Sequence, residues 1–206
     1  MRRQANKQKN SVSQLRIIGG TLRGRKLAIA DLPGLRPTTD RVRETLFNWL
    51  QFEIAGQRCL DLFAGTGALG FEALSRGADE VVLFEQQRQA AQLLRQHAQD
   101  LNPQCTGTLS VAQVDTLQSL KTEAPAPFAI VFVDPPFRSN LAAPSCELLQ
   151  QNGYVAEGSW VYVETEKEWP LQVPENWQLE REKVAGQVCY RLFLVGAVAS
   201  EQEETE

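Results

Sequence analysis

A short apolar run passes into a glycine-rich turn in the stretch Cys59-Leu60-Asp61-Leu62-Phe63-Ala64-Gly65-Thr66-Gly67-Ala68-Leu69-Gly70. The run is typical of a buried strand, and a helix is expected over residues 68–75. Glycine has no Cβ, so the backbone of the turn can approach a ligand closely, while the first N–H groups of the helix remain available to bind it. The stretch predicts the first strand, turn and helix of an α/β fold with a nucleotide-like ligand.

The spacing of Gly65, Gly67 and Gly70 also matches the dinucleotide-binding fingerprint. Glu85 follows Gly65 by 20 positions, where that fingerprint has a carboxylate for the ribose. Two features oppose NAD: Asp61 would place a negative charge close to the pyrophosphate, and nothing downstream is typical of a hydride-transfer site. A cofactor with a cationic ammonium and sulfonium suits Asp61 better, and Glu85 can still accept hydrogen bonds from ribose hydroxyls. An NAD enzyme remains an alternative.

A second motif, Asp134-Pro135-Pro136-Phe137, follows the apolar run 128–133. Neither proline has an N–H, and each has φ fixed near about −65°, so their carbonyls face outward without neighbouring donors. These carbonyls and the Asp134 carboxylate could accept hydrogen bonds from the exocyclic amine of a nucleobase, on which Phe137 would stack. The structural alternative is a rigid turn that closes a buried strand, with Phe137 in the core.

Together these motifs resemble S-adenosylmethionine-dependent methyltransferases of the Rossmann-like class. Two upstream motifs, Arg16-Ile17-Ile18-Gly19-Gly20 and Arg36-Pro37-Thr38-Thr39-Asp40-Arg41-Val42-Arg43-Glu44, narrow the resemblance to the RsmD family, over roughly residues 15–195. The resemblance implies methyl transfer from S-adenosylmethionine to the N2 amine of a guanine in 16S ribosomal RNA. It also favours an assembling small ribosomal subunit as the substrate, with naked RNA as the alternative.

The resemblance assigns Asp61, Gly65 and Gly67 to the methionine part of the cofactor. It assigns Glu85 to the ribose and Asp115 to the adenine amine. An Asp before a short helix is equally typical of an N-cap, and strand-end carboxylates such as Asp61 and Glu85 can also cap neighbouring helices. The complete set of predicted cofactor-binding residues is Asp61, Phe63, Gly65, Gly67, Glu85, Asp115 and Asp134.

The predicted catalytic residues are Asp134, Pro135 and Phe137. The lone pair of the guanine amine is delocalised into the ring. Hydrogen bonds to the Asp134 carboxylate and the Pro135 carbonyl would draw the nitrogen toward tetrahedral geometry and stabilise its growing positive charge. Phe137 would stack on a base swung out of its helix. The released proton would pass to Asp134 or to water. The tetrapeptide by itself does not separate guanine N2 from adenine N6.

Positive charge is concentrated near the N-terminus, because residues 1–43 hold eleven Lys and Arg against two acidic residues although the net charge of the chain is −4. This asymmetry predicts a polyanionic partner engaged through phosphate contacts, whereas a solvated basic tail is the alternative for residues 1–13. Salt bridges at a helix start are an equal alternative for the last three cations of the predicted RNA-contact set. That set is Arg16, Arg23, Arg25, Lys26, Arg36, Arg41 and Arg43.

Apolar periodicity predicts alternating strands and helices from residue 58 onward. The expected strands are 58–63, 80–85, 107–112, 128–134 and 159–164, and the expected helices are 68–75, 87–101, 116–120 and 142–151. Such alternation predicts a parallel sheet with helices on both faces. Segments 177–184 and 188–195 predict a closing antiparallel hairpin, so that the fold expected is a mostly parallel seven-stranded sheet of the class I methyltransferase type.

The N-terminal part is expected to add a small basic β-hairpin from residues 15–18 and 25–29. Asp40 is expected to cap a helix over 41–53. The predicted organisation is a single domain over 15–199, which includes the hairpin and helix (15–55), between a disordered basic tail (1–14) and an acidic disordered tail (200–206).

Composition favours a soluble, cytoplasmic protein, and a monomer is the default expectation. The chain has no apolar run of 18 residues, and its basic start lacks the apolar segment of a signal peptide. Cys59, Cys105, Cys146 and Cys189 form no C-x-x-C pair, which predicts free thiols and no zinc or other metal site. The only histidine, His97, is predicted to lie on the surface.

Two other functions share these features. A DNA adenine-N6 methyltransferase has the same acid-Pro-Pro-aromatic turn but usually needs an added target-recognition region, for which a chain of 206 residues leaves little space. A non-catalytic RNA-binding or ribosome-assembly protein with the same fold is the other alternative. The presence of Asp61, the glycine turn and Asp134 argues against it.

Overall fold

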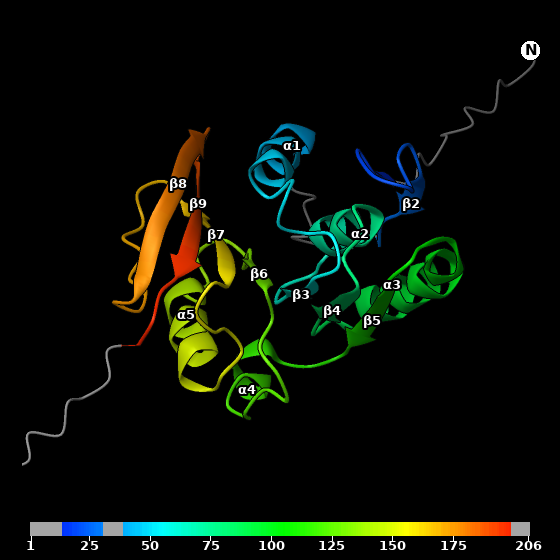
Figure 1. Cartoon of the computed structure of the whole chain (residues 1–206). Coiled ribbons are helices and arrows are strands. Elements are labelled where there is room, and N and C mark those ends of the chain that lie inside the picture. Colours follow the sequence, from blue (N-terminus) through cyan, green and yellow to red (C-terminus); the bar gives the residue numbers. More distant parts are fainter. Residues whose placement is uncertain (1–13, 31–38, 199–206) are drawn as a thin grey trace, which may run out of the picture.

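A twisted sheet of seven strands forms the centre of the structure, a computed structural model that describes residues 14–30 and 39–198 (Figure 1). The strand order is β5-β4-β3-β6-β7-β9-β8. Neighbouring strands from β5 to β7 are parallel, and β9 is antiparallel to both β7 and β8. The strands are β3 (Arg58–Asp61), β4 (Glu80–Phe84), β5 (Thr108–Ala112), β6 (Ile130–Val133), β7 (Trp160–Glu166), β8 (Trp177–Ala185) and β9 (Val188–Val195).

The chain direction across the sheet reverses between β3 and β6. From β3 the chain adds β4 and β5 toward one edge, then returns to place β6 on the other side of β3. In parallel sheets of this kind, ligands bind at the carboxyl ends of the strands that flank such a reversal. The glycine-rich turn follows β3 and the Asp-Pro-Pro-Phe motif follows β6, so the topology brings both motifs to this point.

Helices cover both faces of the sheet (Figure 1). One face is packed by α1 (Asp40–Trp49), α2 (Ala68–Ser75) and α3 (Arg88–Leu101), and the other by α4 (Thr116–Ser119) and α5 (Ala142–Gln151). A short 3-10 turn, η1 (Asn102–Gln104), follows α3. Successive residues of β6 serve opposite faces: Phe132 packs on Phe47 of α1, while Val131 and Val133 join the core beneath α5.

The predicted fold class is confirmed, and the bounds of α2, α5 and β9 are those expected. The prediction for α1 was wrong at both ends. Thr39 is its N-cap, since its hydroxyl accepts from the N–H of Val42 at 3.4 Å, and Asp40 is its first residue. The helix stops at Trp49 and a turn follows, so the expected extension to residue 53 is absent.

A two-stranded hairpin, β1 (Gln14–Arg16) and β2 (Lys26–Ala28), packs against α2 as part of the same core. Glu72 accepts from the N–H of Ile18 at 2.9 Å, and the Ser75 carbonyl accepts from the N–H of Thr21 at 2.8 Å. Gly20 has φ 71°, and a Cβ there would lie 1.8 Å from the Ser75 carbonyl oxygen. Only glycine therefore allows this close approach.

Several smaller predictions can be compared directly with the structure. Gln14 belongs to β1 rather than to the predicted tail, whose other residues, like the tail at 200–206, lie outside the described residues. All four cysteines are free. His97 is half-buried rather than on the surface, because its Nε2 lies 2.9 Å from the Ala28 carbonyl and its ring packs edge-on against Phe71. Within residues 14–30 and 39–198, no helix is long and apolar enough to cross a membrane.

Candidate active site

The turn after β3 adopts a backbone that requires glycine at two positions. Gly65 and Gly67 have φ of 52° and 77°, in the left-handed region. Gly67 is the N-cap of α2 and has no side chain to offer it, and a Cβ there would lie 2.6 Å from the Phe71 ring. The start of α2 therefore keeps its N–H groups directed at the turn, as an anionic or polar ligand group requires.

Asp61 lies at the end of β3 beneath this helix start and is 2% exposed. Its Oδ2 accepts from the N–H of Gly70 at 3.3 Å, and its Oδ1 has no hydrogen-bond partner among the described residues. Burial and the nearby Asp134 raise the pKa of Asp61 to about 7. Oδ2 thus accepts from the first turn of α2, as the capping alternative predicted. Oδ1 is a buried, unused acceptor beside a small cavity lined by Gly65, Thr66 and Asp134.

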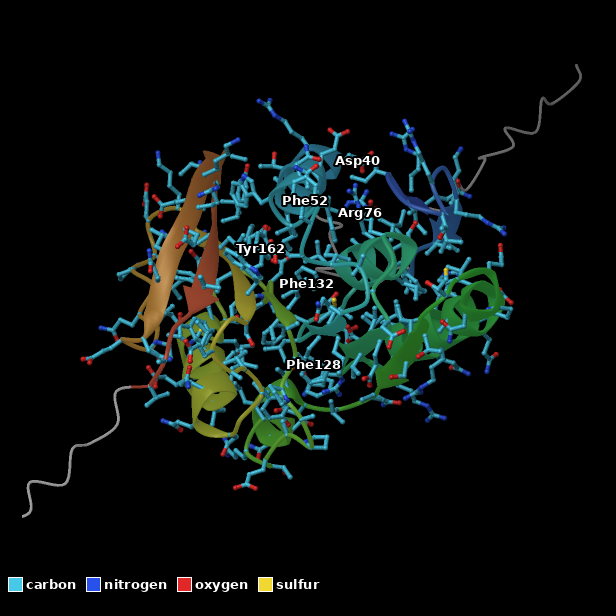
Figure 2. The ribbon with its side chains drawn as sticks, in the orientation of Figure 1. Asp40, Phe52, Arg76, Phe128, Phe132 and Tyr162 are labelled. Carbon is cyan, nitrogen blue, oxygen red and sulfur yellow. The ribbon has the colours of Figure 1, made fainter. Side chains whose placement is uncertain are left out.

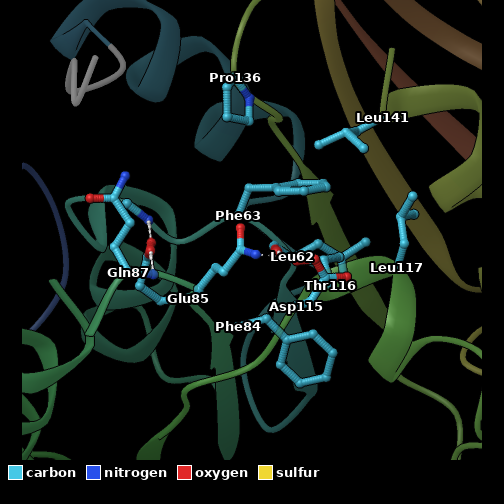
Figure 3. Close-up of a pocket in the computed structure, with 12 residues that line it drawn as sticks. Leu62, Phe63, Phe84, Glu85, Gln87, Asp115, Thr116, Leu117, Pro136 and Leu141 are labelled. Carbon is cyan, nitrogen blue, oxygen red and sulfur yellow. Dashed lines mark hydrogen bonds between the residues drawn. The ribbon is translucent and has the colours of Figure 1, made fainter. Parts of the chain in front are cut away.

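A larger cavity of about 260 Å³ opens beside the turn, at the carboxyl ends of β3, β4 and β5 (Figure 3). Glu85 is buried in its wall and accepts from the N–H groups of Gly65 at 2.9 Å and Gln87 at 2.6 Å. Asp115 caps α4 by accepting from the Gln118 N–H at 2.9 Å, and also accepts from the Gln86 side chain at 3.1 Å. The N-cap alternative for Asp115 is therefore realised, while the residue still lines the cavity.

Most of the remaining wall of this cavity is apolar, and Gln86, Gln87 and Thr116 add polar groups. Phe63, predicted as a cofactor contact, lies across it from the carboxyl groups (Figure 3). The walls also include Pro136 of the predicted Asp-Pro-Pro-Phe motif and three residues that were not predicted as site residues: Phe84, Leu117 and Leu141. Leu117 lies in α4, two residues after its N-cap Asp115, so its closeness to a predicted site residue was the available signal. A planar aromatic group between these walls, with hydroxyls toward Glu85, would be well accommodated.

The Asp-Pro-Pro-Phe turn leaves β6 next to the glycine turn. Asp134 is half-buried and lines the small cavity with Asp61, whereas Pro135 is buried. The Phe137 ring is 50% exposed. The alternative that placed Phe137 in the core was therefore wrong, and the ring is available to stack on a ligand. Arg138, the next residue, has φ 59° and donates its N–H to Glu166.

Three carboxyl groups converge where β3, β6 and β7 end. Asp61 and Asp134 were predicted, but Glu164 was missed. Glu164 is 8% exposed and accepts from the Tyr162 hydroxyl at 2.8 Å. Burial and Asp134 raise the pKa of Glu164 to about 8. Within residues 14–30 and 39–198, no Lys or Arg forms an ion pair with Asp61 or Glu164, so the cluster favours a positively charged ligand.

The predicted RNA-contacting cations have different environments. Arg16, Arg23, Arg25, Lys26 and Arg41 are exposed. Arg16 pairs with Asp40 at 3.4 Å, and Arg25 donates to Gln104. Arg36 lies outside the described residues.

The prediction for Arg43 was wrong. Its side chain is 1% exposed, pairs with Asp40 at 2.6 Å, lies 3.9 Å from Glu72 and donates to the Arg16 carbonyl at 3.0 Å. A buried guanidinium engaged in this way cannot contact a phosphate, so the salt-bridge alternative holds. Arg43 joins α1, α2 and the hairpin.

Comparison with known proteins identifies the family. A family model described as "Conserved hypothetical protein 95" matches residues 15–194. The "Ribosomal RNA small subunit methyltransferase D" of Escherichia coli (strain K12) is 52% identical over 181 residues, which cover 87% of this chain and 89% of that protein. The chain belongs to the RsmD family of methyltransferases. The Haemophilus influenzae protein of the same name is 47% identical, over 89% of this chain and 95% of the relative.

Solved structures agree with the RsmD-family assignment. The Escherichia coli protein yhhF has a TM-score of 0.82 and 46% identity, covering 90% of this chain and all of that one. An RNA methyltransferase from Salinibacter ruber, in complex with S-adenosyl-L-homocysteine, has a TM-score of 0.60 at 14% identity, covering 82% and 100% of the two chains. The second likeness shows the fold alone. The family prediction is confirmed, and the roles of individual site residues stay predictions.

Proposed function

We propose that this protein transfers a methyl group from S-adenosylmethionine to the N2 amine of a guanine in 16S ribosomal RNA. One observation carries the proposal: the Asp134-Pro135-Pro136-Phe137 turn lies beside Asp61 and the glycine turn at the reversal point of the sheet. Acceptors suited to an amine therefore adjoin acceptors suited to a cation. The names of the family relatives support ribosomal RNA of the small subunit as the substrate.

The described residues fit S-adenosylmethionine. The unused Oδ1 of Asp61 is an acceptor for the ammonium group, and the carboxyl cluster favours the positive charges of the ammonium and sulfonium. Glu85 would bind the ribose hydroxyls, and Asp115 would accept from the adenine amine between the apolar walls near Phe63. When bound, the cofactor supplies an electrophilic methyl group.

The chain's own part in the reaction is to hold the amine and exclude water. Asp134 and the Pro135 carbonyl would accept the two N–H groups of the guanine amine, which directs the nitrogen lone pair away from the ring and stabilises the charge it gains. The exposed Phe137 ring would stack on the base. The proton released after transfer would move to the Asp134 carboxylate or to water.

Exposed cations would engage the RNA backbone. The hairpin presents Arg23, Arg25 and Lys26 and α1 presents Arg41, and neutralised phosphates supply affinity and orientation rather than base choice. We infer a monomer that acts in the cytoplasm on the assembling small subunit, where the target guanine is still accessible.

The test is transfer of radiolabelled methyl from S-adenosylmethionine to small ribosomal subunits purified from a strain that lacks this protein. Label that appears in N2-methylguanosine after nucleoside digestion supports the proposal. Label in N6-methyladenosine of DNA would replace it with the adenine alternative. Measurable cofactor binding without label on subunits, naked 16S RNA or DNA would favour the non-catalytic RNA-binding alternative.

A further inference from the structure

Glu164 is a buried carboxyl group to which the reaction described above gives no role. It belongs to β7, is 8% exposed, and lines a small pocket with Pro135 and Phe137. We propose that Glu164, held by Tyr162, accepts a hydrogen bond from the N1–H of the target guanine and so selects guanine over adenine. This inference rests on the proposed function.

The sheet register places Glu164 beside the amine-binding group. Val133 of β6 pairs with Val163 of β7 in parallel register, so Asp134 and Glu164 each follow a paired residue at the same edge of the sheet. The charge of Asp134 also raises the pKa of Glu164, in agreement with this register. When a guanine stacks on Phe137 and its N2 amine binds Asp134, the N1 atom beside that amine would therefore face Glu164.

The chemistry of the two purines differs at that ring position. Guanine presents adjacent donors, the N2 amine and N1–H, whereas adenine presents its N6 amine next to N1, which is an acceptor. An ionised carboxylate can only accept. The carboxylates of Asp134 and Glu164 therefore match the two donors of guanine. With adenine, the Glu164 carboxylate would face the N1 acceptor, and the two acceptors would repel each other.

Tyr162 fixes the orientation of this carboxyl group. Its hydroxyl donates to Oε2 of Glu164 at 2.8 Å, which leaves Oε1 as the second acceptor of the group. The Tyr162 ring is fully buried and packs against Phe132 (Figure 2) at a centroid distance of 6.5 Å. Its centroid lies 6.4 Å from that of Tyr190. Because the Tyr162 ring is packed this closely, its hydroxyl stays in place and holds the Glu164 carboxyl group in one position.

Glu164 must be ionised to present acceptors only, because a protonated carboxyl group can also donate. Burial and the charge of Asp134 raise its pKa to about 8, and the Tyr162 hydrogen bond opposes that rise. Positive charge brought near Asp134 by the cofactor would favour the carboxylate further. We therefore expect the protein to select guanine over adenine when the cofactor is bound.

The test uses small subunits reconstituted with 16S RNA that carries either guanosine or 2-aminopurine riboside at the position the wild-type protein methylates. 2-Aminopurine keeps the reactive amine but has no N1–H. The expected kcat/KM of the wild type is about 10- to 100-fold lower on 2-aminopurine. In Glu164→Gln the amide oxygen would accept from Tyr162, so that the amide NH2 faces the base and donates to N1 of 2-aminopurine. The preference should then shrink to within about 3-fold or reverse.

The two bases also differ in intrinsic reactivity, so the decisive quantity is the change in their kcat/KM ratio between wild type and Glu164→Gln. Glu157→Gln, an exposed change before the opposite end of β7, is the matched control and should keep the wild-type ratio. Tyr162→Phe should reduce the preference in the same direction, which identifies Tyr162 as a positioning residue. Cofactor affinity and thermal unfolding, measured in parallel, establish that each variant is folded.

Two results would overturn the inference. A wild-type protein that uses both bases equally, or a folded Glu164→Gln variant that keeps the wild-type ratio, would show that Glu164 does not read N1–H, while methylation of the guanosine substrate would leave the proposed function intact. A wild-type protein that methylates neither substrate would instead remove the proposed function, and this inference with it.

Discussion

Replacement of Asp61 by Asn should stabilise the ligand-free protein while weakening its affinity for the cofactor. Asp61 is 2% exposed, and its Oδ1 has no partner among the described residues. Its carboxylate form is therefore a buried charge, which the proposed function assigns to a ligand of the opposite charge. Asn has nearly the same shape and can keep the hydrogen bond from Gly70. The substitution thus removes the charge and little else.

The size of the effect follows from the pKa of about 7 in the folded protein against an ordinary value of 3.8. The folded state binds this proton more tightly than the unfolded state, so the stability contributed by Asp61 falls as pH rises from 3.8 and is fully lost above 7. The difference corresponds to roughly 4 kcal/mol in total, of which about 2.5 kcal/mol falls between pH 5 and pH 8. The stability gained by Asp61→Asn should therefore grow by about that amount over this range.

The assay is urea denaturation of wild type and Asp61→Asn, without ligand, from pH 5 to pH 8. Calorimetric titration of S-adenosylmethionine at pH 8 accompanies it and should give a loss of affinity of about 10- to 100-fold, because a charged hydrogen-bonded pair is removed. Asp79→Asn, an exposed change between α2 and β4, is the control and should alter neither quantity. Loss of stability in Asp61→Asn at pH 8 with unchanged affinity would refute the reasoning and leave Asp61 as a helix-capping residue.

Three further substitutions separate catalysis, RNA binding and folding. Asp134→Ala should abolish methyl transfer and leave cofactor affinity within about 5-fold in calorimetry, since its proposed partner is the amine; a larger loss of affinity would mean that its role was misassigned. Arg23, Arg25 and Lys26 replaced together by Ala should weaken RNA binding and flatten its salt dependence by about 3 in log-log slope, and an unchanged slope would remove the hairpin from the RNA contact. Arg43→Ala should cost about 2 to 5 kcal/mol in urea denaturation because it removes a fully buried side chain that joins α1, α2 and the hairpin and leaves a cavity in its place; a cost under about 1 kcal/mol would contradict its structural role.

Local pattern was sufficient for most of the fold. The bounds of α2 were predictable because glycines precede it and apolar residues fill it. Those of β9 were predictable because residues 188–195 are a nearly continuous apolar run between Gly186 and Gly196. The start of α1 was not, since Thr39 and Asp40 are both good caps and the choice depends on tertiary contacts. Asp40 is used instead in ion pairs with Arg16 and Arg43.

The errors in the site have a similar cause. Arg43 has the same local sequence as an exposed helix-start cation, and only its approach to Glu72, which is distant in sequence, shows that it is buried. Glu164 ends a predicted strand as many exposed residues do. A signal was nevertheless present: Tyr162 and Glu164 are two residues apart, so they share a face of β7, and Asp134 ends the neighbouring strand.

The most direct test of the central claim is the methylation state of 16S RNA in cells that lack this protein and are complemented with either the wild-type chain or its Asp134→Ala variant. The RNA is digested to nucleosides, and N2-methylguanosine is measured by mass spectrometry. We predict that the wild-type chain restores one N2-methylguanosine that the deletion lacks and that Asp134→Ala, expressed at the same level, does not. Restoration by both chains, or by neither, would contradict the proposal that this turn performs guanine N2 methylation.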